Sequence, residues 1–265
     1  MQSTLYYLKL YMRFIQLILK ARTQFKFSFI TEIFVNMIFP ISFFSVISFI
    51  VFRLGSLDIW SVEEMILMFG IGLLSWGITN LFLYTPLMEM ESSVNTGKFD
   101  LYLYKPLHPL VLMIFSNFQH TYLGHSIVGA GLIVYSLMNL PQVDIVLVLK
   151  LLYFVFNAVL LHAGIIIFFL CLFFYIRKPL ALVLIFVWDL QIMSRYPMEI
   201  FNKGIQLVFL IVPYVFISYY PVSILMNYDV HPVLVWINCI IGPVILIASV
   251  FTFNKSIVKY DSTGN

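Results

Sequence analysis

The sequence has little charge. Only 10% of its 265 residues are charged, against roughly 25% in an ordinary soluble domain. This small number of charged side chains cannot cover the surface of a globule of this size. Most of the surface must therefore face an apolar medium. The mean hydropathy of +1.00 agrees. The composition excludes a water-soluble fold and predicts one all-α integral membrane domain over residues 1–265.

Cysteines and catalytic motifs are also scarce. Cys171 and Cys239 each lie inside an apolar run without metal or redox spacing, so we expect neither a disulfide framework nor a metal site. Gly97-Lys98 does not end a P-loop, because Phe99 stands where that motif has serine or threonine. The chain therefore does not bind ATP by that route, and we expect no cofactor in it. No basic face for nucleic acid is evident.

A basic amphipathic helix is predicted over residues 1–28. Lys9, Arg13, Gln16 and Lys20 are spaced four, three and four apart, which places them on one helical stripe. Frequent basic residues leave no apolar run long enough for an export signal. The pattern is typical of a helix on a membrane surface, and a basic lead-in to the first span is the alternative.

Apolar runs between charges predict six transmembrane helices. They cover approximately residues 33–52, 65–84, 111–138, 151–175, 180–194 and 233–253. A seventh apolar stretch, 204–228, contains Pro213 and Pro221. If it crossed the membrane, Lys255 and Lys259 would move outside. The positive-inside rule therefore favours six spans with cytoplasmic termini, and residues 195–230 form an outer re-entrant helical hairpin.

Few polar groups interrupt the predicted spans. Three histidines and one aspartate are candidates: His120, His125, His162 and Asp189. They permit an intramembrane hydrolase or acyl transferase, but no HExxH motif or nucleophile elbow supports it, and contacts between packed helices are the simpler interpretation. A carboxylate near mid-membrane costs about 2.5–3.5 kcal/mol. We therefore expect Asp189 to face the bundle interior or a wet cavity, as an ion-pair partner of Arg195 or as a pathway residue.

Residues 85–108 are the longest internal polar connection. Within it, residues 95–97 read Asn-Thr-Gly and predict a helix stop and a turn. The piece that follows is rich in aromatic residues. Because Phe99, Tyr102 and Leu103 would otherwise face water, we expect this cytoplasmic knob to dock into a groove of a partner protein. Resting on lipid headgroups is the alternative.

At this point two motifs resemble a known family. The string Gly97-Lys98-Phe99-Asp100-x-Tyr102-Leu103-x-Lys105-Pro106-Leu107 resembles the GxxDxxLxRPL segment of type-two ATP-binding-cassette (ABC) exporter permeases. The likeness is to the bacterial branch of six-span subunits without their own ATPase. A later run is similar to that branch's outer hairpin: Tyr196-Pro197, Pro213 and Tyr219-Tyr220-Pro221. Lys105 stands where the branch more often has arginine, which keeps the charge but not the bidentate fork.

The resemblance implies a non-enzymatic permease subunit of an ATP-driven exporter, multi-pass in the bacterial cytoplasmic membrane. It implies two cytoplasmic ABC ATPase subunits that bind ATP and Mg²⁺, a second permease, identical or homologous, and contact with membrane lipids. The implied ATPase-coupling residues are Glu91, Gly97, Phe99, Asp100, Leu103, Lys105 and Pro106, in a coupling loop over 85–108. The implied outer gate and pathway residues are Asp189, Arg195, Tyr196, Pro197, Pro213, Tyr219, Tyr220 and Pro221.

The cargo is constrained only by the character of the bundle. An apolar, aromatic-rich interior with few charges favours a hydrophobic or amphipathic substrate such as a peptide, a drug or a lipid. The rival functions are an intramembrane enzyme that uses the membrane-embedded histidines, and a purely scaffolding membrane subunit.

Overall fold

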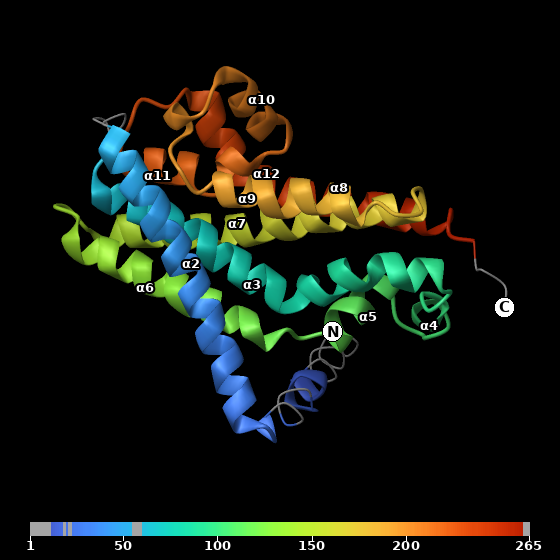
Figure 1. The fold of residues 1–265 in the computed structure, drawn as a ribbon. Coiled ribbons are helices and arrows are strands. Elements are labelled where there is room, and N and C mark those ends of the chain that lie inside the picture. Colours follow the sequence, from blue (N-terminus) through green and yellow to red (C-terminus); the bar gives the residue numbers. More distant parts are fainter. Residues whose placement is uncertain (1–11, 18–19, 21–22, 55–59, 262–265) are drawn as a thin grey trace.

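A computed structural model shows an all-helical chain, without strands over the residues that it describes (Figure 1). These residues are 12–17, 20, 23–54 and 60–261, without the side chains of 43, 46–48 and 50–54. The helices are α2 (Lys26–Leu54), α3 (Val62–Asn95), α4 (Asp100–Leu103), α5 (Pro109–Ser116), α6 (Leu123–Asn139), α7 (Ile145–Leu170), α8 (Leu180–Leu184), α9 (Leu190–Met193), α10 (Lys203–Ile211), α11 (Tyr219–Leu225) and α12 (Pro232–Ile257). The all-α class is thereby confirmed.

Short irregular helical segments join these helices. They are the 3-10 segments η1 (His120–Tyr122), η2 (Cys171–Phe174), η4 (Met198–Ile200) and η5 (Tyr214–Phe216), and the π-helical segment η3 (Ile185–Asp189). Residues 12–17 are helical, but much of the predicted surface helix 1–28 lies outside the described residues.

Four helices of the described chain are long and apolar enough to cross a membrane: Val62–Asn95, His120–Asn139, Ile145–Phe174 and Pro232–Ile257. The helices Lys203–Ile211 and Tyr214–Leu225 make a fifth candidate, bent by 78°, a geometry shared by broken spans and re-entrant loops. The stretch Leu180–Met193 is a shorter apolar helix. The first predicted span lies within α2, which is 29 residues long.

The expectation of one continuous helix over 111–138 is wrong. Helix α5 ends at Ser116, and helical structure resumes only at His120. Between them, the backbone amide of Gln119 donates to the carbonyl of Leu81 in α3, with 2.8 Å between nitrogen and oxygen. A neighbouring helix therefore supplies the partner that an uninterrupted helix would have supplied itself.

Helix α3 forms the centre of the bundle, packed against α6 on one side and α7 on another. The α3–α6 contact is close because a Cβ atom added at Gly129 would lie 2.5 Å from the backbone nitrogen of Leu74. In Figure 1, α4, α5 and the end of α12 lie at one end of the bundle, and α10 and α11 lie at the other. The segments expected at opposite membrane faces are thus separated along the bundle.

Candidate functional site

The predicted coupling loop, 85–108, has two parts in the structure. Helix α3 continues to Asn95, so residues 85–95 are helical, and residues 96–108 form the non-α3 part, called the coupling segment below. The predicted stop at 95–97 is confirmed. Thr96 follows the helix as its C-cap, and Gly97 adopts a φ of 75°, a conformation that glycine reaches without a steric penalty.

Phe99 lies inside the chain rather than on the surface of the coupling segment. Its side chain is 0% exposed, and its ring centroid lies 5.2 Å from that of Phe174 and 5.1 Å from that of Tyr260. The expectation that Phe99 faces water or a partner is therefore wrong. It fails because η2 and the C-terminal end of α12 cover the ring. Tyr102 packs against Phe99 at 5.9 Å and is half-buried.

The remainder of the coupling segment faces outward. Asp100 is partly exposed at the start of α4, Leu103 and Lys105 are exposed, and Pro106 follows them on the surface. Tyr104, which the sequence analysis did not single out, is 82% exposed, against 41% for Leu103. The buried Phe99 thus fixes the position of the short exposed helix α4, which follows it directly.

Glu91 makes a contact within the chain. Its Oε2 atom accepts a hydrogen bond from the backbone nitrogen of Leu180 at 2.9 Å, at the start of α8. A carboxylate there satisfies a free amide and complements the helix dipole. One turn later, Nδ2 of Asn95 donates to the carbonyl oxygen of Arg177 at 2.7 Å. The end of α3 is therefore tied to the connection between α7 and α8.

The opposite end of the bundle holds a second cluster, built around Glu199. Its two carboxylate oxygens accept hydrogen bonds from the Tyr219 hydroxyl at 2.8 Å and from Nε1 of Trp60 at 3.3 Å. The Tyr228 hydroxyl donates to Glu64 at 2.9 Å, and its ring lies 4.6 Å from that of Trp60. Burial and the hydrogen bond to Glu64 raise the pKa of Tyr228 to about 12.

Sequence reasoning found only Tyr219 in this outer cluster. Trp60, Glu199, Glu64 and Tyr228 were missed because they come from segments far apart in the chain. Their only local signal is Ser61-Val62-Glu63-Glu64, which matches a helix capping box. The structure forms that box, with the Ser61 side chain accepting from the Glu64 backbone and the Glu64 side chain accepting from Ser61.

The other predicted gate residues surround the bend between α9 and α11. Tyr196 is buried beside Phe69, and Pro197 is buried next to it. Pro213 lies at the 78° bend between α10 and η5. Tyr220 packs against Phe216 with the rings tilted and 5.0 Å between their centroids, and Pro221 occupies the first turn of α11.

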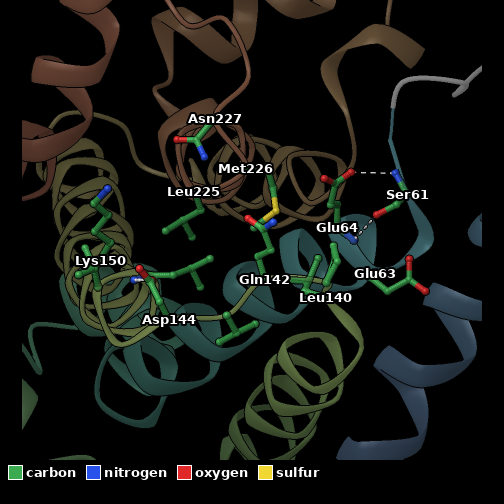
Figure 2. A pocket seen from close by; sticks show the side chains of 14 residues that line it. Ser61, Glu63, Glu64, Leu140, Gln142, Asp144, Lys150, Leu225, Met226 and Asn227 are labelled. Atoms are coloured by element: carbon green, nitrogen blue, oxygen red, sulfur yellow. Dashed lines mark hydrogen bonds between the residues drawn. The ribbon is translucent and has the colours of Figure 1, made fainter.

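A pocket of about 640 Å³ opens beside the outer cluster (Figure 2). Glu63, Asp144 and Lys150 line it, together with Asn227. Two of its acidic groups have structural roles: Asp144 accepts from the backbone nitrogen of Leu147 at 2.7 Å as the N-cap of α7, and Glu64 belongs to the capping box of α3. No group of three potential metal ligands occurs among the described residues.

Asp189 is not buried in the bundle interior, so that alternative of the expectation is wrong. The side chain is exposed at the end of the π-helical segment, whereas Arg195 is only 5% exposed. No ion pair joins Asp189 and Arg195 in the described chain. The ion pair that the structure shows among the described residues is between His120 and Glu32, at 3.0 Å. The extra residue of the π turn changes which side of the helix Asp189 occupies.

The histidines are separate as well. His162 packs edge-on against Trp76 at 5.5 Å, and His125 lies against Tyr122 at 5.0 Å. Neither makes a described contact with Asp189. Among the residues that the structure describes, His125 and His162 therefore form no pair with Asp189 for an intramembrane enzyme.

The fold is that of a helical membrane protein, with the exposed coupling segment at one end of the bundle and a bent, proline-containing segment at the other. The ABC-2 family transporter protein model matches residues 35–264 of this chain. The chain therefore belongs to the ABC-2 transporter family and is a multi-pass membrane protein. No curated protein and no solved structure matches it.

Proposed function

We propose that the chain is the permease subunit of an ATP-driven exporter in the bacterial cytoplasmic membrane. Members of its family are membrane components of transporters, and this membership implies association with an ABC ATPase. The proposed complex contains two cytoplasmic ATPase subunits that bind ATP and Mg²⁺, and a second permease of the same or a homologous sequence.

The proposed topology has six spans and cytoplasmic termini. The spans are α2, α3, His120–Asn139, Ile145–Phe174, the helix 180–194 and α12, and residues 195–230 enter and leave the outer side as a hairpin. The coupling segment and the end of α12 share one end of the bundle (Figure 1). Basic residues gather there, as the positive-inside rule expects of a cytoplasmic face: Lys98, Lys105, Arg177, Lys178, Lys255 and Lys259.

The observation that carries the proposal is the anchoring of the coupling segment. Phe99 is buried against Phe174 and Tyr260, while Leu101, Leu103 and Tyr104 remain exposed on the same short helix. This arrangement is suited to transmit force, because a displacement of the exposed apolar side chains must also move the buried Phe99 and the residues packed against it. The exposed side chains are proposed to fit a groove of the ATPase.

Force would pass from the coupling segment to the outer end along two connections. The contacts of Glu91 and Asn95 join the end of α3 to the chain just before α8. Helices α8 and α9 then lead directly to the bend at Arg195 and Tyr196. Closure of the ATPase subunits would thereby shift α8 and α9 against α3. This small sliding movement of packed helices would open the hairpin outward.

A pull-down of the ATPase tests the proposal. The permease is co-expressed with an ABC ATPase subunit from the same organism and purified as wild type, as Tyr104→Ala and as Tyr135→Ala. Tyr104 and Tyr135 are 82% and 55% exposed, but Tyr135 lies in α6, away from the coupling segment. We expect Tyr104→Ala alone to reduce recovery of the ATPase. Equal recovery with all three proteins would contradict the docking assignment, and absence of any bound ATPase would contradict the transport proposal.

A further inference from the structure

A second cavity, of about 410 Å³, lies between α2 and the centre of the bundle. Its lining comes from α2, α3, η1, α6 and the α9 region: Val35, Asn36, Phe39, Pro40, Trp76, Tyr84, Gln119, Thr121, Tyr122, His125, Trp188, Gln191, Ile192 and Arg195. Trp76 lies about 21 Å along α3 from Val62 and about 28 Å from Asn95, at about 1.5 Å per residue. The cavity is therefore at mid-bundle depth.

Arg195 lines this cavity as a buried cation that forms no ion pair with an acidic side chain of the described residues. It is 5% exposed, its Nε atom has no hydrogen-bond partner among the described residues, and its guanidinium carbon lies 5.3 Å from the centre of the Phe69 ring. Glu32 of α2 pairs with His120 instead. A buried charge without a counter-charge is strongly destabilising, and one ring face offsets only part of that cost.

The position of Arg195 is set by a glycine in α3. A Cβ atom added at Gly72 would lie 2.7 Å from Cγ of Arg195. The arginine stem therefore lies directly on the α3 backbone, where only glycine leaves room for it. This contact gives a way to displace the guanidinium without removing its charge.

Gln191 adds a second polar side chain without a partner. It is 1% exposed, and neither its Oε1 nor its Nε2 atom has a hydrogen bond among the described residues. Buried amides are nearly always hydrogen-bonded in folded proteins. Trp188 in the π-helical segment, Gln191 in α9 and Arg195 just after α9 all line the cavity. Such π segments are frequent at functional sites.

Most of the remaining lining is apolar or aromatic, with Asn36, Gln119, Thr121 and His125 as the other polar side chains. Trp76 and Trp188 lie edge to face with 5.8 Å between ring centroids, and Tyr84 lies 6.0 Å from Trp188. The cavity volume falls within the range of about 300–1,000 Å³ that is common for small-molecule sites. Aromatic walls around a few convergent polar groups are typical of such sites.

We propose that this cavity binds an amphiphile that carries one anionic group, a carboxylate or a phosphate, on an apolar body. The anion is held by the Arg195 guanidinium and the Gln191 amide, and the apolar body lies against Trp76, Trp188 and Tyr84. As a statement about cargo, this rests on the proposed permease function. The anion satisfies the buried arginine, and planar carboxylate and phosphate groups match the guanidinium fork.

Binding to the purified chain tests the proposal without any ATPase. The chain is placed in phosphatidylcholine nanodiscs as a Trp60→Phe/Trp236→Phe variant, so that the fluorescence of Trp76 and Trp188 reports the cavity. The probes share a twelve-carbon chain and differ in the head: dodecanoate, dodecyl phosphate and the neutral dodecanamide. A charge-assisted hydrogen bond contributes about 1.5–3 kcal/mol, so we expect both anions to bind at least about tenfold more tightly than the amide.

Substitutions in the same background assign this preference to Arg195. Arg195→Gln and Gly72→Ala should each abolish the preference, the second with the charge retained, and Gln191→Leu should reduce it. Lys203→Gln removes an exposed charge of α10 outside the cavity and should leave the preference unchanged. If Arg195→Gln does not fold, as judged by gel filtration and circular dichroism, Gly72→Ala and Gln191→Leu decide the outcome.

Further measurements identify the source of the ligand and define the results that would overturn the proposed anion site. Displacement of dodecanoate by phosphatidylglycerol in the nanodisc would indicate that a lipid headgroup reaches the site; without displacement, a free amphiphile is the ligand. Equal binding of the amide and the anions, or a preference that survives in both Arg195→Gln and Gly72→Ala, would overturn the anion site. Neither result would bear on transport itself, because ATPase recovery and ATP-driven transport are measured separately.

Discussion

Phe99→Ala should release the coupling segment from the bundle. The ring is fully buried and lies within 5.2 Å of Phe174 and Tyr260, centroid to centroid. Truncation of a buried phenylalanine to alanine costs about 3–5 kcal/mol. Phe99 is the principal contact of a short segment, so most of this cost should appear as easier local opening rather than as global unfolding.

Hydrogen exchange of the segment's backbone amides measures this opening. In the native chain the amide of Phe99 donates to the carbonyl of Ser93, and the amide of Tyr104 donates to that of Asp100, each at 3.0 Å. At about 1.4 kcal/mol per tenfold change, a local loss of about 3 kcal/mol corresponds to exchange that is faster by roughly a hundredfold. Global melting should change less.

Tyr104→Ala is the matched control for Phe99→Ala. It removes an aromatic ring from the same segment, but from a side chain that is 82% exposed. We expect it to leave exchange in residues 98–104 nearly unchanged and to reduce ATPase recovery. If Phe99→Ala left the exchange rates as in the wild type, the anchoring of the coupling segment, and with it the force-transmission argument, would be refuted.

Three further predictions concern packing and the outer end. Gly129→Ala should lower the free energy of unfolding by about 1–3 kcal/mol, because the added Cβ would meet the backbone of α3, whereas Gly131→Ala, with nothing within 4 Å, should not; thermal melting in detergent measures both. A double-mutant cycle of Tyr219→Phe and Glu199→Gln should show a coupling energy of about 0.5–3 kcal/mol for their hydrogen bond, and a value near zero would contradict it. Because the pKa of Tyr228 is raised to about 12, its contribution to stability is complete below pH 10 and is lost as the pH rises through 12; denaturant midpoints for Tyr228→Phe should fall less steeply over that interval than for the wild type.

The helical class and the local breaks were predictable because they depend on neighbouring residues. The Asn-Thr-Gly stop at 95–97 ends α3 as expected, and the chain bends by 78° where Pro213 interrupts an apolar run. Both follow from backbone chemistry, since glycine reaches positive φ and proline cannot donate an amide hydrogen bond. The interruption before His120 was missed because its partner, the carbonyl of Leu81, belongs to another helix.

Side-chain orientation was the main source of error. Phe99 was expected on the surface and is buried, while Asp189, expected in the bundle interior or a wet cavity, is exposed rather than buried in the interior. In the first case, a covering surface comes from Phe174 and from Tyr260 near the end of the chain. In the second, a π-helical turn changes the helical register, which an assumption of 3.6 residues per turn does not anticipate.

By itself, the sequence determined that this protein lies in a membrane as a bundle of helices, because 62% hydrophobic and 10% charged residues leave no other solvent for its surface. It also determined where the chain must stop and bend. Only the tertiary structure decided which polar groups meet. Trp60 and Glu199, or Gly72 and Arg195, are far apart in the chain, and their proximity depends on how α3 packs against the elements that follow it.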